Sequence, residues 1–185
     1  MTARPDTTII APVPEADAVI GSLRAAHDPA AALGVPAHIT LLGPFLAPER
    51  VDARVRERLA AILAGRGPIA VSLRAVRRFP ETLYLAPEPA EPFAELTRAL
   101  WEAWPECPPY GGAYETVIPH LTIGHGMTEA EVARASAALL ERLPIEATLE
   151  RAELIAYDRA ALLAIGAGGP RDGAPPAEVL ARFAL

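Results

Sequence analysis

The chain has 185 residues, of which 51% are hydrophobic and 22% are charged, so it can form a sizeable core and is not disordered as a whole. Its 17 basic and 23 acidic residues give a net charge of −6, which argues against binding of a long nucleic-acid duplex. A single cysteine excludes an intramolecular disulfide and a multi-cysteine zinc site, and the absence of lysine excludes lysine chemistry.

Nothing in the sequence directs the chain to a membrane or out of the cell. Its apolar stretches are shorter than the roughly 18 residues that a membrane span needs. The N-terminus also lacks a basic stretch followed by an apolar run, the pattern of a secretory signal peptide. We therefore expect a cytoplasmic monomer without membrane contacts, folded as one domain over residues 1–185.

The first half of the chain alternates strand and helix patterns. β-Branched residues predict a strand over residues 7–13, and helical spacing of apolar residues predicts a helix over residues 15–26. A turn at residues 28–29 precedes a short apolar strand over residues 37–42. The remaining elements of this half are a helix that begins at Pro48 and ends at Gly65, and a hairpin with strands over residues 69–79 and 82–85.

The second half repeats this order. A helical apolar stripe comprises Phe93, Leu96, Leu100 and Trp104. A loop rich in proline and glycine over residues 105–112 leads to a short strand over residues 120–124. Thr128 and Glu131 have the spacing of a capping box, which predicts a helix through residue 141. The last predicted elements are strands over residues 145–157 and 161–165, followed by an exposed loop over residues 166–176. Residues 178–183 fit a strand or a short helix, and we favour the strand.

Two of the short strands carry the same pattern. Each has a histidine, an apolar residue, a threonine and another apolar residue, beginning at His38 and again at His120. A proline precedes each histidine, by two positions at His38 and by one at His120. Because side chains alternate across a strand, each histidine shares a face with its threonine, while the apolar residues point to the opposite face. If the two halves pack about a pseudo-two-fold axis, both polar pairs converge on one cleft.

Two imidazoles and two hydroxyl groups in one cleft suit phosphoryl transfer through a cyclic phosphate. Both imidazoles titrate near neutral pH, so one can accept a proton while the other donates one. The hydroxyl groups of Thr40 and Thr122 can donate hydrogen bonds to the phosphoryl oxygens. This chemistry requires no metal ion or other cofactor. A single His–x–Thr triplet is more often structural, and the prediction depends on finding two triplets in equivalent places.

With these two motifs, the chain resembles the two-histidine (2H) phosphoesterase superfamily, in particular bacterial proteins of the 2′-5′ RNA ligase and cyclic phosphodiesterase family. The most specific segments are residues 36–45 (PAHITLLGPF) and 108–122 (PPYGGAYETVIPHLT). The resemblance implies a bilobal α+β fold in which two antiparallel sheets face a central groove and helices pack outside. It also implies that His120 acts as the base and His38 as the acid, while Thr40 and Thr122 hold the phosphate.

The sequence departs from this family at one place. The family often has an arginine a few residues after the second threonine, where this chain has Gly124 and His125. We interpret His125 as a candidate phosphate contact in that position, with an exposed loop histidine as the alternative. Three aromatic residues that flank the motifs, Phe45, Tyr110 and Tyr114, are candidates for stacking on a base, as in proteins that bind single-stranded RNA. The alternative is packing in the core, which is the more common role of an aromatic residue beside a short strand.

The leading hypothesis is a metal-independent cyclic phosphodiesterase that opens the 2′,3′-cyclic phosphate of a nucleotide or an RNA terminus. The reverse reaction, a 2′-5′ RNA ligase activity, is an alternative that the acidic charge disfavours for long RNA. A non-catalytic module that binds nucleotides or RNA ends is a further alternative. Binding alone would not need two groups that titrate near neutral pH, which favours an enzyme.

Overall fold

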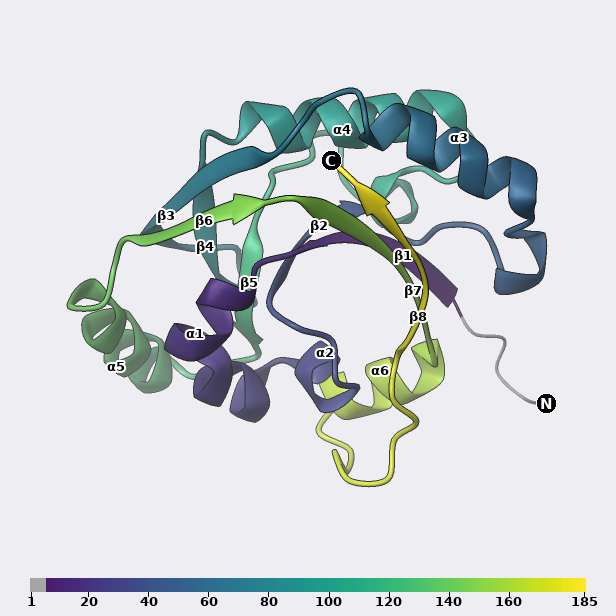
Figure 1. Ribbon diagram of the computed structural model, residues 1–185. Helices are drawn as coiled ribbons and strands as arrows, with labels where there is room; N and C mark the ends of the chain where they lie inside the picture. Colours follow the sequence, from purple (N-terminus) through teal and green to yellow (C-terminus); the bar gives the residue numbers. More distant parts are fainter. Residues whose placement is uncertain (1–5) are drawn as a thin grey trace.

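The computed structural model describes residues 6–185, which form the predicted α+β fold (Figure 1). Residues 1–5, which the predicted domain includes, lie outside this range. The strands are β1 (Asp6–Pro12), β2 (His38–Leu42), β3 (Ile69–Arg78), β4 (Thr82–Glu88), β5 (Leu121–His125), β6 (Ile145–Leu149), β7 (Arg151–Tyr157) and β8 (Glu178–Ala184). The α-helices are α1 (Pro14–His27), α2 (Pro29–Ala32), α3 (Ala53–Leu63), α4 (Glu91–Ala103), α5 (Glu129–Leu140) and α6 (Arg159–Gly166).

The strands of residues 6–185 form one sheet in the order β6-β3-β4-β5-β2-β1-β7-β8, in which all neighbours are antiparallel. The two halves of this sheet meet at β2 and β5, where Ile39 lies opposite Leu121. The sheet curls so strongly that β6 leads into β7 across Glu150, although these strands belong to different halves (Figure 1). The two sheets expected from the sequence are therefore halves of one curled sheet, continuous through a narrow seam.

The two halves also exchange their supporting helices. Apart from the short helix α2 and two 3-10 turns, the order β1-α1-β2-α3-β3 is repeated as β4-α4-β5-α5-β6, which gives the predicted pseudo-two-fold pattern. Helix α4 packs on β2 and helix α1 packs on β5, so each central strand is supported by a helix from the opposite half. Helices α3 and α4 lie together on one side of the sheet, away from α1 and α5 (Figure 1). This exchange sets the position of β2 relative to β5.

Local sequence signals account for several helices. The predicted apolar stripe of α4 is confirmed, because Phe93, Leu96 and Leu100 are completely buried in the core. The predicted capping box of α5 is also confirmed, with reciprocal hydrogen bonds between Thr128 and Glu131. No helix within residues 6–185 is both long enough and apolar enough to cross a membrane.

The sequence prediction is wrong for residues 161–165, which belong to helix α6 and not to a strand. The Asp158 carboxylate caps this helix by accepting hydrogen bonds from the backbone N–H groups of Ala160 and Ala161. The run of alanine, leucine and isoleucine is apolar throughout, so its periodicity does not distinguish a buried helix from a strand.

Other differences from the predicted elements are smaller. The predicted strand over residues 145–157 is divided at Glu150 into β6 and β7. The predicted turn at residues 28–29 opens the short helix α2, which Asp28 caps through the Ala30 N–H. The helix predicted from Pro48 begins only at Ala53, after a short 3-10 turn over Pro48–Arg50. The predicted strand at the C-terminus is confirmed as β8.

Candidate active site

The two predicted motifs lie side by side at the centre of the sheet. Pairing of Ile39 with Leu121 in antiparallel strands sets His38 across from Thr122 and Thr40 across from His120. All four side chains are half-buried and line the same cavity, whereas Ile39 and Leu121 are completely buried on the opposite face. The strand alternation read from the sequence therefore brings the four polar groups together.

Both imidazoles are held in the same way. His38 Nδ1 lies 2.8 Å from the carbonyl oxygen of Pro36, and His120 Nδ1 lies 2.8 Å from the carbonyl oxygen of Ile118. A carbonyl oxygen only accepts hydrogen bonds, so each Nδ1 carries the proton and donates it. In the neutral ring, Nε2 then keeps a free lone pair. This arrangement leaves the Nε2 atoms of both histidines available for proton transfer.

Burial lowers the pKa of both histidines from the ordinary value of a free imidazole. For His38, the hydrogen bond to Pro36 opposes this effect, and the positive charge of Arg24 adds to it. The two imidazoles also repel each other when both are charged, which lowers the pKa of His38 further. Protonation of one ring therefore disfavours protonation of the other, as a pair that acts as acid and base requires.

His120 lies among aromatic rings. The ring centroid of Phe79 lies 5.2 Å from that of His120 and meets it edge-on, and the centroid of Tyr84 lies at 5.4 Å. Tyr110 lies nearly parallel to the imidazole at a centroid distance of 6.1 Å. Phe79 and Tyr84 also stack on each other with their centroids 4.2 Å apart. These rings exclude water from His120, which is the main reason for its lowered pKa.

His38 lies near a buried ion pair instead. The guanidinium of Arg24 and the carboxylate of Asp28 approach within 2.8 Å, and both side chains are only 3% exposed. Arg24 also donates a hydrogen bond of 3.0 Å to the carbonyl oxygen of Val35, in the segment that leads to the first motif. Asp17 binds the same guanidinium and accepts from the backbone N–H of Ala37. The charged network thereby holds the backbone from which His38 projects.

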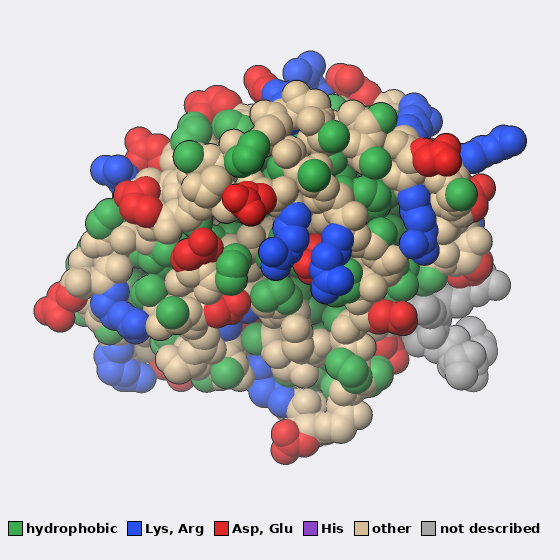
Figure 2. Space-filling model, in the orientation of Figure 1, with side chains coloured by type: hydrophobic (Ala, Val, Ile, Leu, Met, Phe, Trp, Pro, Cys, Tyr) green, Lys and Arg blue, Asp and Glu red, His purple; other side chains and the backbone are tan. Residues whose placement is uncertain are grey.

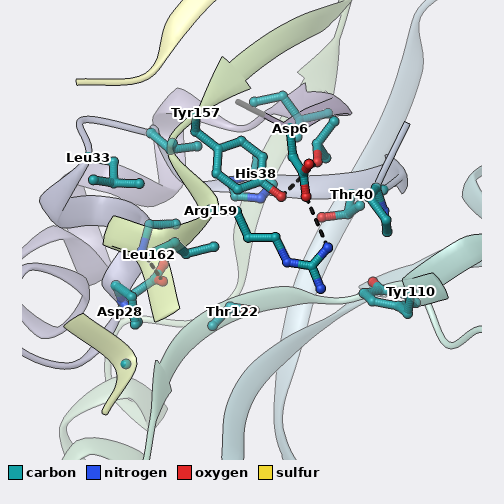
Figure 3. Close-up of a pocket in the computed structure, with 18 of the residues that line it drawn as sticks. Asp6, Asp28, Leu33, His38, Thr40, Tyr110, Thr122, Tyr157, Arg159 and Leu162 are labelled. Atoms are coloured by element: carbon teal, nitrogen blue, oxygen red, sulfur yellow. Dashed lines mark hydrogen bonds and ion pairs between the residues drawn. The ribbon is translucent and has the colours of Figure 1, made fainter. Parts of the chain in front are cut away.

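The motifs border a cavity of about 600 Å³ lined by residues from both halves of the sheet (Figure 3). Its volume lies within the range of ligand pockets. Beyond the polar centre, the wall is apolar and is formed by β1, α2, β7 and α6, with Ile10, Leu33, Val35, Ile155, Leu162 and Leu163. The cavity therefore suits a small ligand with a charged group at the motifs and an apolar group against this wall.

Three of the four predicted binding residues line this cavity: Tyr110, Tyr114 and His125. Burial raises the pKa of Tyr110 to about 12, so its hydroxyl keeps its proton. His125 is exposed at the end of β5, where its Nδ1 lies 2.9 Å from the Thr82 hydroxyl.

The prediction for Phe45 is wrong, because its ring is only 7% exposed and packs edge-on against Trp104 in the core. The backbone still borders the cavity at Gly43 and Pro44, but the Phe45 side chain points into the core. Nearness to a motif in sequence therefore does not show to which side a side chain points once its strand has ended.

Several residues around the motifs were not predicted from the sequence. Arg159 and Tyr157, which lie at the junction of β7 and α6, line the cavity, and Arg159 forms an ion pair with Asp6 at 3.1 Å. Phe79 and Tyr84 lie in the predicted hairpin, far from His120 in sequence. One local signal in the sequence could have indicated Arg159. An aspartate such as Asp158 is a common helix cap, which would place Arg159 at the start of a helix.

No cluster of three or more His, Cys, Asp or Glu side chains suited to a metal ion occurs within residues 6–185. The potential donor groups in the cavity are instead distributed: the two motif histidines, His125, and the carboxylates of Asp6 and Asp28. The Asp28 carboxylate is already bound by Arg24 and by the N–H of Ala30. The site is therefore built from imidazoles and hydroxyl groups.

A family model described as the 2′-5′ RNA ligase superfamily matches residues 12–161, a segment that includes both motifs. The chain belongs to this superfamily of two-histidine phosphoesterases. It is also 31% identical over 126 residues to "Putative phosphoesterase GK0864" of Geobacillus kaustophilus, an alignment that covers 65% of this chain and 70% of that protein.

Solved structures support the fold. The chain is similar to LigT of E. coli complexed with 3′-AMP, with a TM-score of 0.56 and 19% identity over 98% of both chains. It is also similar to TT0787 of Thermus thermophilus, with a TM-score of 0.60 and 20% identity over 97% of both chains. A curled antiparallel sheet with outer helices is thus shared by these 2H phosphoesterase-like structures.

Proposed function

We propose that the protein is a metal-independent cyclic phosphodiesterase that opens the 2′,3′-cyclic phosphate of a nucleotide or an RNA end. The observation that carries this proposal is the pair of His–x–Thr strands that face one cavity, each with its imidazole anchored through Nδ1. The similarity to LigT complexed with 3′-AMP adds support. A nucleotide with a 3′-phosphate belongs to the class of products that the opening of a 2′,3′-cyclic phosphate gives.

In the proposed reaction, Nε2 of His120 accepts a proton from water as the water oxygen forms a bond to phosphorus. The bond between phosphorus and one ribose oxygen breaks, and His38 donates its proton to that oxygen. The hydroxyl groups of Thr40 and Thr122 stabilise the negative charge on the phosphoryl oxygens. The products are a phosphate monoester and a free ribose hydroxyl, and the two imidazoles regain their starting states by proton exchange with solvent.

The division of roles follows the resemblance to the family, which implies that His38 is the acid and His120 the base. Burial lowers the pKa of both histidines. At His38 the positive charge of Arg24 lowers the pKa further and outweighs the opposite effect of the Asp28 carboxylate. At His120 the positive charge of His125 has the same lowering effect.

The charge distribution favours a small substrate or a strand terminus. Figure 2 shows acidic and basic side chains intermixed over one face of the described residues, without an extended basic surface. With a net charge of −6, the protein does not offer the electrostatic attraction that long nucleic acids require. We therefore propose an enzyme that acts on one small cyclic phosphate or strand terminus at a time.

The test is hydrolysis of the four 2′,3′-cyclic nucleotides in the presence of EDTA, for the wild type and for His38→Ala and His120→Ala. Removal of a general acid or base should lower kcat by about 10² to 10⁴-fold. Binding of 3′-AMP to both variants should persist, since neither change removes the threonines. His27→Ala is the matched control because His27 ends α1 and does not line the cavity.

Two results would contradict the proposal. Turnover that EDTA abolishes and added metal restores would show that the reaction depends on a metal ion. Binding of cyclic nucleotides without turnover, unchanged in either histidine variant, would instead indicate a nucleotide-binding module.

A further inference from the structure

A substrate phosphate brings a negative charge into a cavity that offers little positive charge. The two motif histidines have lowered pKa values, and the carboxylates of Asp6 and Asp28 also line the cavity. The chain has no lysine, and Arg159 is the only arginine among the described residues that line this space. A cyclic phosphodiester would therefore meet one permanent cation within the described part of the cavity.

The nearby Arg24 is not available for this purpose. Its side chain is 3% exposed, and its guanidinium nitrogens are bound to Asp28, Asp17 and the carbonyl oxygen of Val35. Moving it toward a ligand would break a buried ion pair, which is strongly unfavourable. Arg24 thus acts on the cavity only through its charge and through the backbone that it holds.

Arg159 is placed differently. It is the first residue of α6, directly after the capping residue Asp158, and its guanidinium points into the cavity toward the side occupied by Thr40 and Tyr110 (Figure 3). Its side chain is 56% exposed, so it is free to adjust. One contact holds it in place, between Nη1 and the Asp6 carboxylate at 3.1 Å.

This single contact takes up only one of the guanidinium nitrogens, Nη1. An arginine has five N–H donors in a planar fork that matches two phosphate oxygens. The Asp6–Arg159 ion pair is open to solvent on its Arg159 side, with side chains 56% and 27% exposed, so it contributes little to stability and can rearrange at small cost. Asp6 therefore holds the guanidinium beside the motifs without competing strongly with a phosphate.

We propose that Arg159 binds the non-bridging phosphoryl oxygens of the substrate, and that Asp6 keeps its guanidinium in the cavity when no substrate is bound. This inference rests on the proposed function, which supplies the phosphate. It assigns the cationic contact to the start of α6 and not to the motif strands. Arg159 is a substrate-binding residue in this scheme, and Asp6 is a positioning residue that acts through it.

The experiment compares Arg159→Ala, Arg159→Lys and Asp6→Asn in steady-state kinetics with a 2′,3′-cyclic nucleotide and in calorimetric titration with inorganic phosphate. Loss of charge-assisted hydrogen bonds should lower kcat/KM of Arg159→Ala about 10- to 100-fold and weaken phosphate binding in parallel. Arg159→Lys should recover part of this loss, because it keeps the charge without the fork. Asp6→Asn should weaken phosphate binding less than Arg159→Ala does, by no more than about fivefold, because it loosens the position of the guanidinium but keeps its charge.

Arg50→Ala is the matched control. Arg50 forms a similar ion pair with Glu106, also at 3.1 Å and with a side chain 58% exposed, but lies outside the cavity. Its kinetics should match those of the wild type, and denaturant titration of every variant checks that the fold is retained.

Two results would overturn the assignment. A kcat/KM within twofold of wild type for Arg159→Ala would show that Arg159 does not bind the phosphate. Equal loss in Asp6→Asn and Arg159→Ala would show that the ion pair is only structural. If the wild type does not hydrolyse cyclic phosphates, the titration still decides whether Arg159 binds phosphate, so failure of the proposed function is distinguishable from failure of this inference.

Discussion

Strands β2 and β5 carry the same motif, yet the surroundings of their histidines differ. Both imidazoles donate through Nδ1 to the carbonyl oxygen two residues earlier. Behind His38, however, lies the buried pair of Arg24 and Asp28, whereas aromatic rings surround His120. The backbone thus repeats the geometry of the motif, and the packing around it gives each histidine its own electrostatics. An acid and a base need this difference, because one must hold a proton while the other lacks it.

The largest effect on stability is expected where the ionic network is broken. Arg24→Met leaves the buried Asp28 carboxylate without its cation and removes the hydrogen bond to Val35. We expect a loss of about 3 to 5 kcal/mol in the free energy of unfolding, measured by urea titration. The double variant Arg24→Met, Asp28→Leu should regain much of this loss, because the uncompensated charge is then absent.

The control for this prediction is Arg98→Ala, which removes an exposed pair with Glu102 on α4. Its effect should be no more than about 0.5 kcal/mol. If Arg24→Met lowered the free energy of unfolding as little as this control does, the ionic network of Arg24, Asp28 and Asp17 would not hold the first motif in place.

A smaller effect is expected on the β5 side. A methyl group at Gly124 would lie 2.5 Å from Cβ of His27 and 3.1 Å from Sδ of Met127, so α1 and β5 would have to move apart. Gly124→Ala should therefore cost about 1 to 3 kcal/mol in the free energy of unfolding. Gly21→Ala is the control, since nothing lies within 4 Å of its added methyl group.

In the middle of α1, Gly21→Ala should be stabilising by up to about 1 kcal/mol. The measurement is the midpoint temperature of thermal unfolding for Gly124→Ala and Gly21→Ala. Equal midpoint temperatures would mean that the contact between α1 and β5 is loose enough to accept a side chain.

The smallest effect concerns the pH dependence of the reaction. Both histidines have pKa values below that of a free imidazole, which is about 6.5. The enzyme is active when one histidine is protonated and the other is neutral. We therefore expect kcat/KM to peak below about pH 6.5. A bound phosphate favours the protonated form, which raises these pKa values and should move the kcat profile to higher pH.

Phe79→Leu tests whether the aromatic surroundings of His120 set its pKa. It reduces the burial that lowers the pKa of His120, so the optimum of kcat/KM should move to higher pH by a fraction of a unit. Phe183→Leu, the same change at a buried core position away from the cavity, should leave the optimum unchanged. An unshifted optimum in Phe79→Leu would indicate that this ring does not set the pKa.

Several features could be predicted because their causes are local. Alternation along a strand places His38 with Thr40, the capping box marks the start of α5, and the spacing of apolar residues predicts α4. Helix α6 was not predicted because its apolar run has no clear period, and Phe45 was misjudged because its partner Trp104 is distant in the chain.

The two His–x–Thr strands, and the side chains that share a face on each, follow from the amino-acid order alone because a strand has a two-residue repeat. The same motifs indicated the superfamily. The surroundings of those faces depend on the folded chain: the ion pair behind His38, the aromatic rings at His120, and Arg159 at the cavity. These neighbours come from other strands and helices, and a pKa or a binding contact depends on the distance between groups and not on their order in the chain.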